Sequence, residues 1–196
     1  MEPVIPDLYA SDPEPLPFAP SQSMRACLLR RDAGNLLVYS APTVDAAQVA
    51  GLGGAERILL NHWHEAEFGG GAEVAAALDA PLTGERAAPL EPPGADVRAI
   101  PIPGHTPGAT AFLWNGALFT GDSIYVDEGE WVGAVLESSD REAYLVSLER
   151  LRELEFDLLV PWVVTAGRPF AVETDPADAR RRIDAIIARV RRGEDR

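Results

Sequence analysis

Hydrophobic positions along the chain change their period several times, and these changes predict alternating strands and helices. The first 22 residues, rich in proline and acid, predict an extended entry segment with one strand near Val4–Tyr9. Apolar or alternating runs predict further strands at 24–31, 35–40, 56–61, 96–104, 109–115, 117–122 and 157–164. Patterns with a period near 3.6 predict helices at 43–52, 70–80, 140–155 and 175–193.

Short local signals indicate where several of these elements begin and end. The turn at Asp32–Gly34 predicts a hairpin, and Asn115-Gly116 is a strong two-residue hairpin signal. Ser139 followed by Glu142 has the spacing of a capping box at the start of a helix. Asp175-Pro176 predicts the start of the last helix, because proline is favoured at the first helical position.

The order of these elements indicates one layered domain. Mixed strands flanked by amphipathic helices bury their apolar faces against one another, and such strands and helices can form two halves of the same layered structure. A chain of 196 residues fits a single domain over residues 1–196 with a sizeable core.

Composition excludes several classes of function. The formal net charge is −14, and the basic residues are 17 arginines without a lysine, so nucleic-acid and anionic-membrane partners, Schiff-base chemistry and lysine-dependent phosphate loops are not expected. No apolar run approaches the roughly 20 residues that cross a bilayer. The single cysteine, Cys27, lies in an apolar run and is expected in the core. With an acidic start to the chain, these features favour a cytoplasmic protein.

Three histidines and one aspartate are candidates for a metal site. His62 and His64 follow a predicted strand, where alternation places them on one face with Trp63 on the other. His105 lies in a Gly/Pro-rich loop after another strand, and Asp122 closes a third strand. Imidazole nitrogens and a carboxylate suit zinc. Taken singly, the H-x-H histidines could also be ordinary core or surface residues, and Asp122 could be a turn aspartate that bonds its own backbone.

Taken together, three segments resemble the metallo-β-lactamase superfamily of glyoxalase II-like and related hydrolases. ILLNHWHEAEFGG is similar to the family's strand and H-x-H-x-D-H loop, PGHTPGATAFLWNGALFTGDSIY to its third-histidine loop and bridging-aspartate strand, and SLERLRELEFDLLVPW to its later helix and strand. The resemblance implies a four-layer αβ/βα sandwich, with residues 24–83 forming most of one half and 97–163 most of the other. It also implies a first metal held by His62, His64 and His105, with Asp122 bridging to a second.

The chain departs from the family pattern at the second metal site. Ala66 and Glu67 stand where the motif has aspartate and histidine, Val163 stands near the position of the closing histidine, and Tyr39 replaces an aspartate. Glu67 could supply one oxygen, and Glu65 another if the loop bends.

These residues predict a hydrolase with one metal site, in which a metal-bound water attacks a carbonyl or phosphoryl centre of a small-molecule substrate. Zinc is the expected ion, with iron or manganese also compatible with mixed nitrogen and oxygen ligands. Asp122 or Glu67 would accept the proton from the water. The metal ligands under this hypothesis are His62, His64, His105, Asp122 and Glu67.

Two alternatives remain open at this stage. The chain could be an inactive family member whose pocket binds a small molecule or partner, or zinc could only brace the loops. Four aromatic residues could line an apolar pocket mouth or pack in the core: Trp63, Phe68, Tyr125 and Trp131. Substrate and oligomeric state do not follow from the sequence.

Overall fold

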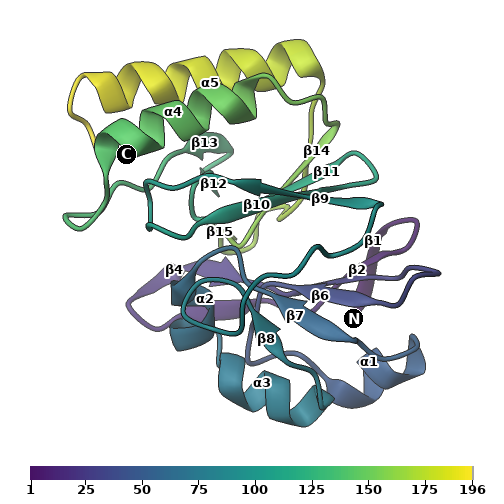
Figure 1. The fold of residues 1–196 in the computed structure, drawn as a ribbon. Helices are drawn as coiled ribbons and strands as arrows, with labels where there is room; N and C mark the ends of the chain where they lie inside the picture. The colour runs from purple at the N-terminus through teal and green to yellow at the C-terminus, as the bar shows by residue number, and fades with distance from the viewer. Residues whose placement is uncertain (196) are drawn as a thin grey trace.

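The computed structural model describes residues 1–195, which form a layered α/β structure (Figure 1). Two sheets lie between an upper pair of long helices and a lower set of shorter helices. This arrangement is the predicted four-layer αβ/βα sandwich, because each sheet buries one face against the other sheet and one against helices.

The lower sheet comes from the N-terminal half of the chain. Its six strands run in the order β1 (Glu2–Ile5), β2 (Leu8–Ala10), β5 (Cys27–Leu29), β6 (Leu36–Val38), β7 (Arg57–Leu59) and β8 (Leu82–Thr83). β5 and β6 form the hairpin expected at Asp32–Gly34. Two helices lie below this sheet (Figure 1): α1 (Ala46–Gly51) and α3 (Gly71–Leu78). Cys27 is fully buried in the sheet, as expected for a core residue.

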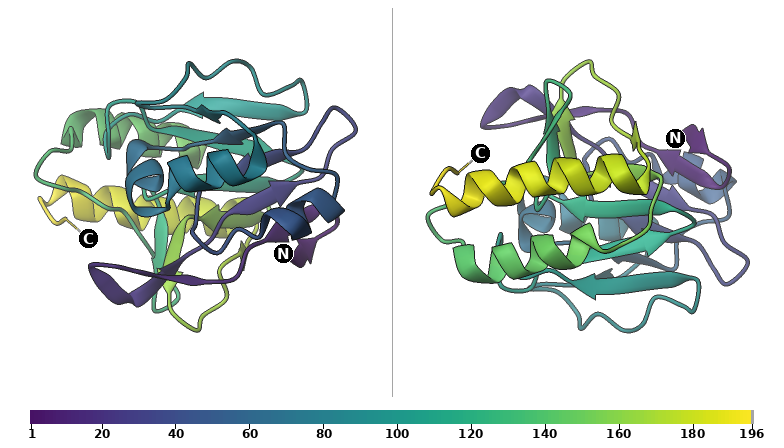
Figure 2. Two further views of the ribbon diagram at one scale, coloured as in Figure 1. Left: turned by 90° about the horizontal axis from the view of Figure 1, so that it is seen from below. Right: turned by 90° about the horizontal axis from the view of Figure 1, so that it is seen from above.

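The upper sheet comes from the C-terminal half. Its strands run in the order β16 (Val172–Glu173), β14 (Leu158–Pro161), β11 (Ala117–Gly121), β10 (Thr110–Trp114) and β9 (Val97–Pro101). Asn115 and Gly116 both have positive φ and form the predicted turn between β10 and β11. Two helices lie side by side across this sheet (Figure 2): α4 (Arg141–Arg152) and α5 (Pro176–Arg191). The last helix therefore covers a sheet, as predicted.

A third sheet joins the two halves. It runs in the order β13 (Glu130–Val132), β12 (Tyr125–Asp127), β15 (Val163–Thr165), β4 (Ala19–Met24) and β3 (Glu14–Leu16). The antiparallel pairing of β4 with β15 connects an N-terminal strand to a C-terminal one. The sequence pattern did not predict β3 and β4, because their prolines and serines give little apolar alternation.

Three local expectations are corrected. The segment near Val4–Tyr9 is a hairpin, since Asp7 turns the chain with φ +66° between β1 and β2. The N-cap of α4 is Asp140, whose carboxylate accepts from the Ala143 N–H at 3.0 Å. Ser139 instead donates to the carbonyl of His105 at 2.9 Å. The third correction is that the histidine motif begins a helix at Trp63.

The core between the two sheets contains packed aromatic rings from both halves of the chain. Tyr39, at the end of β6, meets Phe119 of β11 edge-on, with ring centroids 6.0 Å apart. Both side chains are fully buried. None of the helices in residues 1–195 is long and apolar enough to cross a membrane.

A candidate metal centre at the edge of the two sheets

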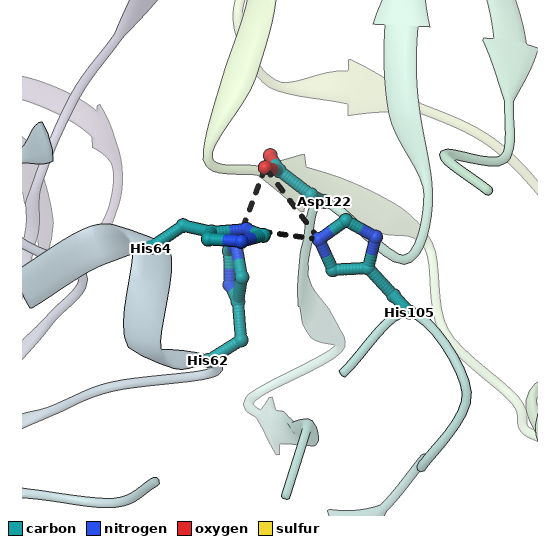
Figure 3. Close-up of side chains that lie close together, drawn as sticks. All are labelled: His62, His64, His105 and Asp122. Carbon is teal, nitrogen blue, oxygen red and sulfur yellow. Dashed lines mark hydrogen bonds and ion pairs between the residues drawn. The ribbon is translucent and has the colours of Figure 1, made fainter. Parts of the chain in front are cut away.

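Four side chains from distant parts of the sequence meet at one point (Figure 3). His62, His64, His105 and Asp122 each offer one ligand atom, and these atoms all lie within 4.8 Å of one another. Figure 3 shows the three imidazole rings and the carboxylate pointing toward a common centre. The expectation that His105 lies close to the other two histidines agrees with this geometry.

The two histidines of the H-x-H motif reach this point from a helix start and not from a strand. β7 ends at Leu59, and His62 is the N-cap of α2 (Trp63–Phe68), with extended backbone at φ −153° and ψ 167°. His64 lies in the first turn of α2. The side chains converge because the chain changes from extended to helical between them, which places their ring centroids 4.9 Å apart. The predicted strand alternation with Trp63 opposite is therefore wrong.

A buried glutamate fixes the orientation of His62. Glu65 is fully buried, and its Oε1 lies 2.8 Å from the Nδ1 of His62. Its Oε2 accepts from the Asn61 N–H at 2.9 Å, so both carboxylate oxygens are used. The Nε2 of His62 then faces Asp122 Oδ2 at 3.2 Å. A carboxylate on the far nitrogen of a histidine is the usual support of a metal ligand, so Glu65 is a positioning residue and not a source of a free metal oxygen.

His105 is fixed in a similar way. Its Nδ1 lies 2.9 Å from the carbonyl oxygen of Ala134, to which it donates in the tautomer that leaves Nε2 with a free lone pair. That Nε2 lies 3.2 Å from His64 Nδ1 and 3.9 Å from Asp122 Oδ2. The bond from Ser139 to the His105 carbonyl holds the loop itself. The nitrogens that face the centre are therefore Nε2 of His62, Nδ1 of His64 and Nε2 of His105.

The titratable groups of this centre have pKa values shifted in different directions. Burial opposes a charge on His62, but the carboxylates of Asp122 and Glu65 outweigh burial and raise the pKa of His62 to about 10. Burial and the positive charge of His62 lower the pKa of His64 to about 4. Burial opposes ionisation of Asp122, yet His62 and the other two histidines lower its pKa. Without a metal ion, these shifts favour a proton on His62 over one on His64.

The donor set fits a transition-metal ion. Three imidazole nitrogens form the ligand set of a catalytic zinc site, which leaves a further position for water, and the Asp122 carboxylate is an additional possible ligand. The Oδ1 of Asp122 is buried and has no hydrogen-bond partner within residues 1–195, although buried carboxylate oxygens are normally paired. A cation at the centre would satisfy the negative charge on this group.

The position of a second metal ion is built differently from the family pattern. The Tyr39 hydroxyl donates to the Val160 carbonyl at 2.6 Å and accepts from the Gly121 N–H at 2.9 Å, so it serves as a structural bridge. Ala66 and Val163 carry no donor atom. Glu67 is exposed and is not part of the four-residue group.

The approach of Asp122 to His62 depends on a glycine that sequence reasoning missed. Gly121 has φ +56°, and a Cβ at this position would lie 2.2 Å from Asn61 Oδ1. Asn61 in turn donates to the Thr110 carbonyl at 2.5 Å, which links the residue before His62 to β10. The signal in the sequence is the glycine directly before the candidate ligand, because only glycine fits this conformation beside Asn61.

Three of the four candidate ligands, His64, His105 and Asp122, line an open cleft of about 430 Å³, whereas His62 is buried behind them. Phe68 and Tyr125 line the cleft, as one of the two sequence interpretations allowed. Trp131 is buried elsewhere, and Trp63 lies beside the site with the Arg86 guanidinium 4.0 Å from its ring centroid. The complete lining is Leu16, Phe18, Gln22, His64, Phe68, His105, Asp122, Tyr125, Ala134, Leu136, Trp162 and Val163.

Comparison with known proteins agrees with this architecture. A chain from Halorhodospira halophila named hydroxyacylglutathione hydrolase is 31% identical over 152 residues, which cover 67% of this chain and 58% of that relative. This chain thus spans less than two thirds of the relative's length. An archaeal metallo-β-lactamase superfamily protein from Sulfolobus tokodaii has a TM-score of 0.68 at 16% identity, covering 91% of this chain and 85% of its own. A metallo-β-lactamase from Pontibacter korlensis also has a TM-score of 0.68, at 12% identity and with 97% of both chains covered.

These two structures share the fold, and the family itself is shown by the sequence. The model of the metallo-beta-lactamase superfamily matches residues 38–162, which include all four side chains of the candidate centre. The chain belongs to the metallo-β-lactamase superfamily.

Proposed function

We propose that this protein is a metal-dependent hydrolase with a single metal site formed by His62, His64, His105 and Asp122. The observation that carries the proposal is the convergence of three ring nitrogens and one carboxylate, within 4.8 Å of one another, beside an open cleft that His64, His105 and Asp122 line. Zinc is the ion that this donor set suits best, and iron or manganese are compatible with it.

When bound, such an ion would polarise a carbonyl or phosphoryl oxygen and make a water molecule more acidic. Glu65 keeps the Nε2 of His62 directed at the centre, and the Ala134 carbonyl does the same for His105. Asp122 has one oxygen facing His62 and a second, Oδ1, without a protein partner in the described chain. We assign the acceptance of the proton to the Asp122 carboxylate. Glu67 is exposed and does not line the cleft, so it has no part in this proposal.

The single-site proposal rests on the supply of ligands. Beyond the four-residue group, the second position would have only Asp122 as a shared oxygen, since Ala66 and Val163 offer no donor. The Tyr39 hydroxyl has its proton and one lone pair engaged by Val160 and Gly121. A borderline-soft ion usually requires more nitrogen or sulfur donors than this position supplies.

Turnover by the metal-loaded protein tests the proposal. The panel contains carboxylic esters, thioesters including a hydroxyacylglutathione, lactones, lactams and phosphodiesters, and His64→Ala is the matched control. We expect hydrolysis of at least one class by the zinc-loaded wild type and background rates for the variant. Metal uptake without any turnover would refute the hydrolase proposal and favour a binding module that has kept the family's metal site.

A further inference from the structure

The cleft beside the metal ligands is mainly apolar, and no arginine or lysine side chain of the described chain lines it. Outside the metal group, its lining residues are Leu16, Phe18, Gln22, Phe68, Tyr125, Ala134, Leu136, Trp162 and Val163. Gln22 and Tyr125 are polar, and the indole N–H of Trp162 donates to the Ser40 carbonyl at 2.9 Å. The one charged group in the whole lining, apart from protonation of a histidine, is the Asp122 carboxylate. A ligand in this cleft therefore meets mainly hydrocarbon and aromatic surface.

The apolar surface continues onto the rim. Phe18, in the turn between β3 and β4, is 66% exposed, and Leu136 is 42% exposed. These two side chains and Val146 on α4 are the large exposed hydrophobic residues of the described chain. Phe18 also contacts Phe68 edge-on at 5.0 Å. Exposed apolar groups gathered at one cleft are typical of a binding surface, whereas Val146 lies away from it.

The charged residues near the site do not provide for an anionic substrate. No arginine within residues 1–195 lines the cleft, and Arg86, near the site, lies over the Trp63 ring. Its neighbour Glu85 is held by the Thr106 hydroxyl and the Gly108 N–H. The chain has no lysine and a formal net charge of −14. A carboxylate or phosphate in the cleft would lose hydration without gaining a cationic side chain as a partner.

We propose, on the basis of the hydrolase function above, that the substrate is a neutral carboxylic ester, thioester or lactone with an apolar acyl chain. The acyl chain would lie against Leu16, Phe18 and Leu136, with its carbonyl toward the metal ligands. In the reaction the bond between the acyl carbon and its oxygen or sulfur leaving atom breaks. Water supplies a hydroxyl group to the acyl carbon and a proton to the leaving group, so the products are a carboxylic acid and an alcohol or thiol.

A series of matched esters tests the substrate class. The zinc-loaded protein is assayed with p-nitrophenyl acetate, butyrate, hexanoate and octanoate, and with the mono-p-nitrophenyl ester of suberic acid. The suberate has the octanoate chain length but carries a terminal carboxylate. We expect kcat/KM to rise about fourfold for each methylene that the cleft buries. We expect the kcat/KM of the suberate ester to be at least about tenfold lower than that of octanoate, because its carboxylate is desolvated without a cationic partner.

Variants at the rim connect this preference to the cleft. Phe18→Ser and Leu136→Ser should each lower the ratio of octanoate to acetate turnover about tenfold, since each removes apolar surface from the chain's path. Val146→Ser is the matched control, because it makes the same kind of change on an exposed side chain of α4 and should leave the ratio unchanged. Circular dichroism should show that all three variants are folded.

Binding without turnover separates this inference from the proposed function. Octanamide, acetamide and the monoamide of suberic acid are titrated while tryptophan fluorescence is followed, because Trp162 lines the cleft. Tighter binding of octanamide than of the other two would support the apolar cleft even if no ester were hydrolysed, in which case only the hydrolase proposal fails. Hydrolysis with a flat chain-length series, or a suberate ester as good as octanoate, would overturn the inference and leave the hydrolase proposal standing.

Discussion

Replacement of Tyr39 by phenylalanine should destabilise the fold at the point where Asp122 is held. The pairing of β11 with β14 shifts between Phe119 and Gly121, and the Tyr39 hydroxyl lies at this irregularity. It donates to the Val160 carbonyl at 2.6 Å and accepts from the Gly121 N–H at 2.9 Å. Phenylalanine keeps the ring against Phe119 but removes the hydroxyl that pairs with the Val160 carbonyl and the Gly121 N–H.

The expected loss follows from these two hydrogen bonds. An unpaired buried donor or acceptor costs about 1–3 kcal/mol, so Tyr39→Phe should lower the free energy of unfolding by about 2–4 kcal/mol, allowing for partial relaxation. Domains of ordinary stability have about 5–15 kcal/mol in total. For a chain of this length, the change corresponds to a fall in Tm of about 4–16 °C.

Urea unfolding of the metal-free and zinc-loaded proteins measures the effect. Tyr9→Phe is the matched control, because Tyr9 is a half-buried tyrosine on β2 whose ring faces Arg30, and its change should stay within about 0.5 kcal/mol. If Tyr39 also positions Asp122 through Gly121, zinc should bind Tyr39→Phe about tenfold more weakly. The stabilisation gained from zinc would then fall by about a further 1.4 kcal/mol.

Two results would contradict this reasoning. A loss below about 0.5 kcal/mol in the metal-free variant would mean that other groups satisfy Val160 and Gly121 as well as the hydroxyl does. An equal loss with and without zinc would limit Tyr39 to a role in stability and separate it from the metal site.

Three further predictions concern the metal centre. Glu65→Gln should weaken zinc affinity about 10–100-fold in a chelator competition, whereas the exposed control Glu67→Gln should change nothing; equal effects would refute the positioning role of Glu65. Metal analysis after dialysis should find about one zinc per chain, retained in Glu67→Ala and lost in His64→Ala; two tightly held ions would contradict the single site. Because the pKa of His62 is raised to about 10, zinc binding should displace a proton from this histidine. Calorimetry at pH 7.5 in buffers of different ionisation enthalpy should therefore show release of about one proton per ion, and zinc affinity should rise with pH. Zinc binding without proton release would contradict a protonated His62.

The sequence by itself determined much of the architecture. The stripe of Ala179, Ile183, Ile186, Ile187 and Val190 predicted the buried face of α5, and the same residues are buried in the structure. Asn115-Gly116 specified the turn between β10 and β11. These features depend on neighbours within a few positions, so periodicity and turn chemistry are sufficient to predict them.

Short and polar elements could not be predicted in this way. β4 exists because it pairs with β15, more than 130 residues later, and its own residues give no strand period. The histidine segment becomes helical at Trp63, although its two histidines at alternate positions suggested a strand. Long-range hydrogen bonds and a turn at His62 override the local pattern in both cases.

The features of the metal site also separate into those visible in the sequence and those set by the tertiary structure. Histidine and aspartate are visible in the sequence as potential ligands because their donor atoms are properties of the residue type. The role of Glu65 was not visible, because it depends on burial against His62 and Asn61, and the exposure of Glu67 depends on which side of α2 faces the core. The identity of the donors is a local property of the chain. Their partners, charge states and access to the cleft are set by groups from distant segments that only the tertiary structure brings together.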